Sequence, residues 1–301
     1  MLMDAILKKE QLGAIVGQPH VLDDAASLDG YGRDQSLAPA LKPWFVVRPG
    51  DGAQVQALVA WANQTRTPLI PVSSGPPHFH GDTVPSVPEA VIVDLTRVNA
   101  IRRIDPRNRI AVIEPGVTYA QLDAALAAQG LRIPRPLAPR ANKSVVASLL
   151  ERQPTLIPRF NYNLPEPLRT CGVVWGTGEL AFTGEAGTGP LSLDDQWQRG
   201  LAQVDPKGPL ATDLMRVVTG AQGTMGIVVW ASVKLELLPA AREYRFAPGQ
   251  SLGELVDFCY RLERTRLGDA VEVFNAAQLA QLAGRAAAAV AATKRKLPQR
   301  A

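Results

Sequence analysis

The most constraining feature of the chain is a strand, a helix and a second strand within residues 45–72. Phe45–Val47 is a run of β-branched and aromatic residues that predicts the first strand, and Leu69–Val72 predicts the second. Between them, Asp51 is expected to cap a helix. The apolar residues of this helix recur at helical spacing: Val55, Leu58, Val59 and Ala62. Two strands joined by a helix that packs on them pair in parallel, so a βαβ unit is predicted.

The remaining signals complete an α+β pattern. A second helix is expected to begin at Thr118, where Gln121 completes a capping box, and to stop at Gly130. Short apolar runs predict further strands at residues 91–94, 101–104, 110–113, 171–175, 180–183 and 227–238. After Pro239 the pattern predicts a strand near residues 244–246, a helix over residues 251–264, a strand at residues 270–274 and an alanine-rich helical tail. We therefore divide the chain into a helical lead (1–43), a large domain (44–240) and a short C-terminal part (241–301).

Composition excludes several classes of protein. With 46% hydrophobic and 20% charged residues, the chain is expected to fold as a globular protein. Its net charge of +4 is spread along the sequence, so nucleic acid is not an expected partner. Cys171 and Cys259 form no pairing or zinc motif. The apolar run at residues 227–231 is far shorter than the roughly 20 residues of a membrane span. The N-terminus lacks the apolar core of a signal peptide, so a cytoplasmic location is expected.

The loop after the second strand is the first candidate binding element. The chain has no GxGxxG pattern after its first strand and no GxxxxGK[ST] loop, which disfavours NAD binding of the Rossmann kind. A tight loop such as Pro71–Gly75 can instead turn successive N–H groups inward and form a nest for an anion. Ser73 and Ser74 add hydroxyl groups, and Gly75 permits close approach. A plain surface turn is the alternative interpretation.

The second candidate is the glycine-rich segment that precedes a strong strand signal. Residues 220–227 read Gly-Ala-Gln-Gly-Thr-Met-Gly-Ile. Glycines at this spacing indicate backbone that passes close to something flat or bulky, although a tight turn into the strand would explain them as well. Trp230, on the following strand, suits either core packing or a position beside a flat ligand.

Five segments in this order resemble the FAD-binding domain of the p-cresol methylhydroxylase and vanillyl-alcohol oxidase family. They are residues 45–59, the loop at 71–76, the strands and turn at 91–105, residues 112–117 and the glycine segment 220–227. The resemblance covers roughly residues 30–240. It implies a PCMH-type fold of two α/β subdomains followed by a shortened C-terminal cap, with FAD as cofactor.

Carried over position by position, the resemblance implies that Ser73–Pro76 surround the FAD pyrophosphate. The glycine segment would lie along the flavin or the adenosine part. Asp82 and Thr83 would cap the loop or reach a ribose, unless they face solvent. The full implied set is Val72, Ser73, Ser74, Gly75, Pro76, Pro77, His78, Asp82, Thr83, Ser144, Gly220, Ala221, Gly223, Thr224, Gly226 and Ile227.

Three departures from the family pattern affect the expected site. Pro76 and Pro77 stand where the family has Gly and sometimes a flavin-linking His, and proline removes two N–H donors from the nest. His78 and His80 are nearby, either as flavin neighbours or as exposed loop residues. Val146 and Ala147 replace the usual Gly-Gly contact with the flavin. Arg135, Arg140 and Lys143 form a basic group before that position, serving either as a solvated face or to neutralise an anion.

The resemblance implies an FAD-dependent oxidoreductase that takes a hydride from an alcohol, a 2-hydroxy acid or a related small molecule. An electron-accepting protein subunit is an expected partner. Two alternatives stay open: an FAD-holding subunit without a complete active site of its own, and a cofactor-free structural relative. No catalytic residue is assigned from the sequence, because the family supplies those groups late in the cap.

Overall fold

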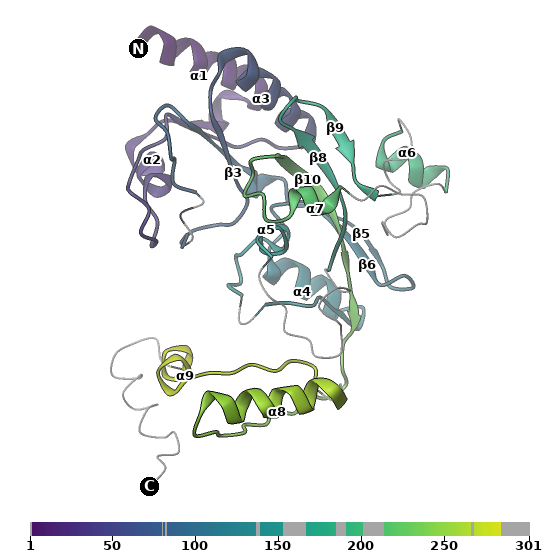
Figure 1. Cartoon of the computed structure of the whole chain (residues 1–301). Helices are drawn as coiled ribbons and strands as arrows, with labels where there is room; N and C mark the ends of the chain where they lie inside the picture. The colour runs from purple at the N-terminus through teal and green to yellow at the C-terminus, as the bar shows by residue number, and fades with distance from the viewer. Residues whose placement is uncertain are drawn as a thin grey trace. The chain divides into compact units, whose positions relative to one another are not determined.

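The computed structural model describes residues 2–79, 81, 83–136, 139–152, 167–184, 191–200, 214–265 and 268–283. These residues form two compact units (Figure 1). The first contains the described residues up to Arg152 and those from 167 to Ala240, so the N-terminal lead packs within it. The second contains the described residues from Ala241 onward.

The first sheet of the larger unit is built around the predicted βαβ motif. β2 (Phe45–Val47) and β3 (Leu69–Val72) both pair in parallel with β4 (Val91–Asp94), and β1 (Val21–Leu22) pairs antiparallel with β2, giving the order β1-β2-β4-β3. α3 (Gly52–Thr65) connects β2 to β3, and the Asp51 side chain caps it by accepting a hydrogen bond from the Gln54 N–H. The two strands are therefore parallel and lie in one sheet, as predicted, but they do not pair with each other, because β4 lies between them.

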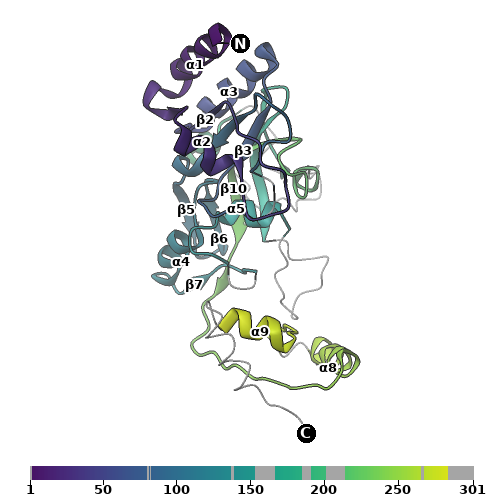
Figure 2. The same ribbon diagram turned by 90° about the vertical axis from the view of Figure 1, so that its left-hand side faces the viewer.

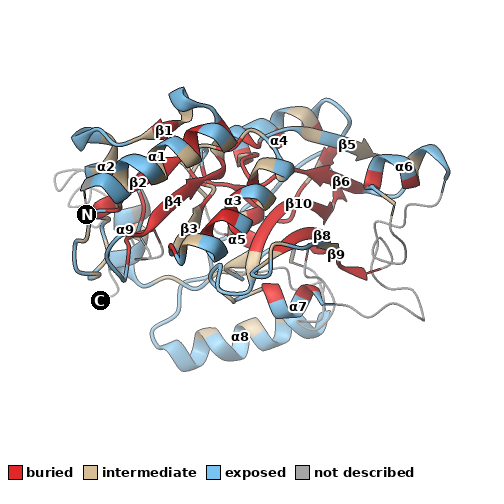
Figure 3. Ribbon diagram, turned by 90° about the horizontal axis from the view of Figure 1, so that it is seen from above, coloured by how far each residue is buried: buried red, intermediate tan, exposed pale blue. Residues whose placement is uncertain are grey.

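The second sheet is antiparallel, with the order β5-β6-β10-β8-β9. Its strands are β5 (Ile101–Asp105), β6 (Ile110–Ile113), β8 (Leu168–Trp175), β9 (Leu180–Phe182) and β10 (Gly226–Lys234). A short third pair joins β7 (Leu131–Arg132) to β11 (Glu236–Leu237). Strand β10 is buried along nearly all of its length, as Figure 3 shows.

Helices fill the space on each side of these sheets. α3 packs between the two sheets and beside α1 (Leu2–Val16), as Figures 1 and 2 show. Its buried Val55, Leu58 and Val59 join one core with residues from both sheets. α4 (Tyr119–Ala127), α5 (Val145–Leu150) and α7 (Met215–Val218) contribute to a second core on the opposite face of the antiparallel sheet.

The shorter elements of this unit complete its surface. α2 (Ala25–Gly32) brings Leu28 and Tyr31 against the remaining face of the parallel sheet, over Val46, Val72 and Ile92. The 3-10 turns are η1 (Gln18–His20) and η2 (Leu95–Arg97), and α6 (Leu193–Gln198) follows β9. None of the described helices is both long and apolar enough to cross a membrane.

The second unit consists of α8 (Leu252–Thr265) and α9 (Ala276–Ala283) with extended chain between them. The strands predicted at residues 244–246 and 270–274 are wrong, because these residues pair with no other strand in the described part of the chain. Tyr244 and Phe246 are 78% and 81% exposed, so their aromatic rings pack against no sheet face. β-propensity without a neighbouring strand and a core does not produce a strand.

Candidate functional site

The predicted anion-binding loop leaves the parallel sheet at the end of the edge strand β3. Val72 is buried in the sheet, and the chain then turns through Ser73, Ser74 and Gly75 into the Pro76–Pro77 pair, which is joined by a cis peptide bond. The backbone N–H groups of these two serines and of Gly75 donate to no acceptor in the described part of the chain. Three donors are therefore available in the loop, while the two prolines supply none.

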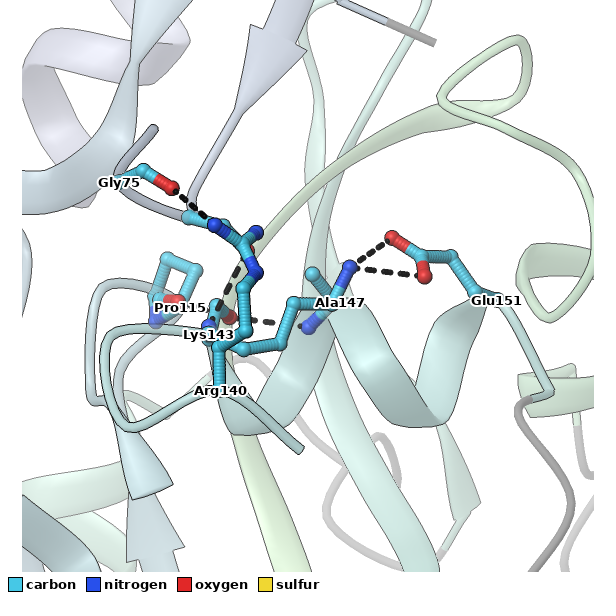
Figure 4. A network of polar contacts seen from close by, with 8 residues as sticks. Gly75, Pro115, Arg140, Lys143, Ala147 and Glu151 are labelled. Carbon is cyan, nitrogen blue, oxygen red and sulfur yellow. Dashed lines mark hydrogen bonds and ion pairs between the residues drawn. The ribbon is translucent and has the colours of Figure 1, made fainter. Parts of the chain in front are cut away.

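A second segment, residues 139–144, holds this loop from one side. The backbone N–H of Ser144 donates to the Ser74 Oγ at 3.1 Å. Asn142 Nδ2 donates to the Pro76 carbonyl at 2.7 Å, and the guanidinium of Arg140 donates to the Gly75 carbonyl at 3.4 Å. Figure 4 shows the side chain of Arg140 reaching toward Gly75. These contacts fix the loop carbonyls and so the orientation of the peptide planes.

Ser144 is the residue that ties the second segment to the fold. It is completely buried and caps α5, with its Oγ accepting from the Ala147 N–H at 3.0 Å. The same hydroxyl donates to the Pro115 carbonyl at 2.6 Å (Figure 4). Because this buried hydroxyl both donates and accepts a hydrogen bond, its rotamer is fixed. Ser144 therefore holds the loop in place through the hydrogen bond from its N–H to Ser74.

The N-terminal lead holds the loop from the other side. The Gln35 N–H donates to the His78 carbonyl at 3.0 Å, and the Gly81 N–H donates to Asp34 Oδ2 at 2.5 Å. His78 is only 8% exposed and its ring lies 6.0 Å from the ring of Tyr31. The alternative of an exposed loop histidine is therefore wrong for His78, whereas His80 lies outside the described residues.

Tyr31 in turn belongs to a partly buried polar cluster with Asp94 and Arg48. Its hydroxyl donates to Asp94 Oδ2 at 2.9 Å, and the Arg48 Nε donates to the same oxygen at 2.8 Å. Burial, followed by the Asp94 charge, raises the pKa of Tyr31 to about 12. The tyrosine therefore stays neutral at physiological pH and acts as a fixed hydrogen-bond donor that positions α2 against the end of β4.

The glycine segment forms a tight turn that reaches both β3 and α5. Gly220, Gln222 and Gly223 have φ values of 76°, 52° and 79°. The Gly220 N–H donates to the Leu150 carbonyl at the end of α5, at 2.8 Å. A Cβ on Gly223 would lie 2.7 Å from Pro71 Cγ, so the missing side chain permits the turn to pack on β3. Gly226 then begins β10.

A pocket of about 410 Å³ lies beside this contact, between α3, β3, the end of β8 and the glycine turn. Its lining includes Leu69 and Pro71 of β3, Trp175 of β8, and Thr224 and Ile227 of the glycine segment. Trp230 is buried elsewhere, with its ring packed on Gly172 and 5.3 Å from the ring of Phe182. The tryptophan beside the pocket is therefore Trp175, and core packing is the role of Trp230.

The structure brings most of the predicted site residues into one region of the first unit. Ser74 and Ser144 are hydrogen bonded, and β3, which leads into the loop, also contacts the glycine turn. The hydroxyl of Thr83 is buried and has no hydrogen-bond partner among the described residues, as expected of a group that awaits a ligand. Asp82 lies outside the described residues. Gly226 is packed against the Val174 carbonyl, so its missing side chain allows the strands of the sheet to pair there.

Three contributors were not found by sequence reasoning. Asp34, Gln35 and Asn142 hold the loop through contacts that span 43 to 66 positions in the sequence. No local pattern marks them, because each lies in irregular chain. Val146 and Ala147 replace the Gly-Gly that the family resemblance led us to expect. Val146 is buried in the core around α5, so its side chain does not extend into the site.

The donor set fits a diphosphate joined to a flat aromatic group. Free N–H groups and the cation of Arg140 gather at the loop, and the buried hydroxyl of Thr83, further along the same connection, has no partner among the described residues. The pocket, lined by both polar and apolar groups, lies next to the same strand. No three His, Cys, Asp or Glu side chains of the described residues gather at a potential metal site. FAD has the chemistry that this arrangement would bind.

Comparison with known proteins agrees with this reading. Residues 43–150 match the family model of an FAD binding domain. A D-2-hydroxyglutarate dehydrogenase of Stutzerimonas stutzeri is 30% identical over 230 residues, which are 76% of this chain and 45% of that protein. The 4-cresol dehydrogenase flavoprotein subunit of Pseudomonas putida is 27% identical over 183 residues, 59% of this chain and 34% of that one. The crystal structure of p-cresol methylhydroxylase with substrate bound superposes with a TM-score of 0.66 at 25% identity, covering 79% of this chain and 44% of that one.

These findings define the class: the chain is a flavoprotein of mixed α and β structure, as the sequence predicted. It contains an FAD-binding domain of the PCMH type, and its cofactor is FAD. The chain spans less than half the length of the D-2-hydroxyglutarate dehydrogenase that it matches.

Proposed function

We propose that the chain holds FAD for an oxidoreductase that transfers a hydride from an alcohol, a 2-hydroxy acid or a related small molecule to the flavin. The observation that carries the proposal is the meeting of the loop after β3, the Ser144 segment and the glycine turn in one region. Relatives named for 2-hydroxyglutarate and for cresol support a small organic substrate with an oxidisable carbon.

Each part of the site has its own role in this proposal. FAD, when bound, supplies the hydride-accepting chemistry. The N–H groups of Ser73, Ser74 and Gly75 would donate to its diphosphate, and the Thr83 hydroxyl would complete its unmet hydrogen bond. The pocket beside Pro71 and Ile227 would take up one of the two aromatic ends.

The substrate-binding and catalytic groups are proposed to lie outside this cofactor site. We infer that the second unit belongs to the part that covers the flavin, and that it acts with a further polypeptide region or subunit. In support, no residue of α8 is buried, although Phe258 and Tyr260 on it are large and apolar (Figure 3). An FAD-holding subunit whose active site another chain completes is therefore the second candidate, with an electron-accepting protein as its partner.

The test begins with the visible spectrum of the purified protein, before and after incubation with excess FAD and gel filtration. We expect oxidised-flavin absorbance at one FAD per chain. A colourless protein that retains no FAD would overturn the proposal and favour the cofactor-free alternative. The loaded protein is then mixed anaerobically with 2-hydroxy acids, alcohols and phenols. Bleaching by any of them supports the oxidoreductase, whereas bleaching only after addition of a partner chain supports the second candidate.

A further inference from the structure

Arg140 occupies an unusual position over the loop after β3. Its guanidinium donates to the Gly75 carbonyl at 3.4 Å, just before the two prolines. It also lies 5.2 Å from the ring centre of Phe79, just after them. The guanidinium is therefore held by contacts on both flanks of the Pro76–Pro77 pair: a hydrogen bond to Gly75, drawn in Figure 4, and a cation–π contact with Phe79.

The charge of Arg140 has no counter-ion in the described part of the chain. The other two cations of the basic group noted in the sequence are paired: Lys143 with Glu151 at 2.6 Å, and Arg135 with Asp123 at 2.5 Å. Burial lowers the pKa of Arg140, although Glu151 at longer range opposes this. A partly desolvated cation without a partner costs free energy that a bound anion would recover.

The loop lacks backbone N–H donors that such a cation would replace. Pro76 and Pro77 carry no N–H groups, so the nest retains the donors of Ser73, Ser74 and Gly75 only. One hydrogen bond of the guanidinium goes to Gly75, and the group has five N–H donors in all. The remaining donors form a fork that matches phosphate oxygens.

We propose that Arg140 binds the diphosphate of FAD and replaces the backbone donors that the two prolines remove. The proposal rests on the placement of FAD at this loop given above. An anionic substrate is the competing ligand for the same cation. The diphosphate is favoured because Arg140 contacts the loop at Gly75, beside the free N–H groups that are proposed to bind the diphosphate.

The test compares Arg140→Gln with Arg135→Gln. The control removes the same charge from a nearby arginine that is already paired with Asp123. Dissociation constants are measured for FAD and for riboflavin, which shares the flavin ring but has no phosphate. We expect Arg140→Gln to weaken FAD binding by about ten- to a hundredfold, the range for a lost charge-assisted hydrogen bond. Riboflavin binding by the same variant, and FAD binding by Arg135→Gln, are expected to change by less than about twofold.

Two results would overturn the proposal: unchanged FAD affinity in Arg140→Gln, or an equal loss for FAD and riboflavin. If wild-type protein binds no FAD, the placement of the cofactor fails instead, which is a different result. A second measurement does not depend on the variant folding. Inorganic pyrophosphate should protect Arg140 of the wild-type apoprotein from an arginine-specific dicarbonyl reagent, as read by peptide mass mapping. Equal modification with and without pyrophosphate contradicts the proposal.

Discussion

The two turns that meet beside β3 are fixed in opposite ways. The loop with Pro76 and Pro77 is held from outside, by side chains of Asp34, Arg140 and Asn142 that bind its backbone. The glycine turn is held from within, because positive φ values at Gly220 and Gly223 close it and the missing Cβ of Gly223 lets it pack on Pro71.

This difference determines where each turn is sensitive to mutation. A turn fixed by backbone conformation is damaged by adding atoms to it. A turn fixed by side chains from elsewhere is damaged by removing those side chains. The two turns therefore predict two different mutational patterns, and the comparison fails if both respond alike.

The largest effect is expected for Gly223→Ala. Its φ of 79° costs an L-residue about 1 kcal/mol, and the new Cβ would lie 2.7 Å from Pro71 Cγ. Overpacking of this kind adds about 1–3 kcal/mol, because the proline ring cannot rotate away. We expect the free energy of unfolding to fall by about 2–4 kcal/mol, measured by urea denaturation, together with weaker FAD binding.

Gly220→Ala is the matched control for this prediction. Its φ is also positive, at 76°, but the nearest atom to an added Cβ is the Arg152 Cδ at 3.7 Å, which is ordinary contact. Only the conformational cost of about 1 kcal/mol is expected. Equal losses in the two variants would show that the contact with Pro71 contributes nothing.

The same contrast explains how much of the fold the sequence predicts. The Asp51 cap and the Thr118–Gln121 capping box were found correctly because their partners lie three residues apart. The parallel direction of β2 and β3 follows from the helix between them, whereas the insertion of β4 between the two strands was not predicted. The strand predicted at residues 244–246 was wrong because a strand needs a neighbour, which the local pattern does not reveal.

In the candidate site as well, features with a local sequence signal were predicted and long-range contacts were not. Prolines and glycines mark both turns locally, so both turns were found. The residues that hold the first turn could not be found, since Asp34 and Gly81 are 47 positions apart and Asn142 and Pro76 are 66 apart. The basic character of Arg140 was visible in the sequence, but its contact with Gly75 was not.

A smaller effect is expected for Ser74→Ala, which tests the side-chain support of the proline loop. The Ser74 Oγ accepts from the N–H of Ser144, and Ser144 is completely buried. Loss of this acceptor leaves a buried N–H group unsatisfied, which costs about 1–3 kcal/mol. Ser73→Ala is the control, since its hydroxyl has no hydrogen-bond partner in the described part of the chain, and about 0.5 kcal/mol or less is expected. Urea denaturation compares the two, and a Ser73 loss as large as the Ser74 loss would contradict this account of the loop.

The smallest effect concerns Asp34 and its dependence on pH. Burial acts to raise the pKa of Asp34, but hydrogen bonds from Ser36 and from the Gly81 N–H outweigh it and lower the pKa below 3.8. A lowered carboxyl pKa contributes stability that is complete above the unfolded value near 3.8 and is lost as the pH falls through the folded value. Asp34→Asn should therefore lower the free energy of unfolding by about 0.5–1 kcal/mol at pH 6, because one hydrogen bond to the loop is lost. The effect stays small because solvent screens the charge of Asp34.

That cost should shrink below about pH 4, since the wild-type carboxyl then becomes protonated as well. The comparison is made by urea denaturation at pH 6 and pH 3.5, with Asp29→Asn as the control; Asp29 pairs with Lys42 on the surface and binds no part of the loop. A cost for Asp34→Asn that is the same at both pH values would mean that the charge of Asp34 does not hold the loop. The N-terminal lead would then support the proline turn through the backbone contact of Gln35 with His78 and the ring contact of Tyr31 with His78.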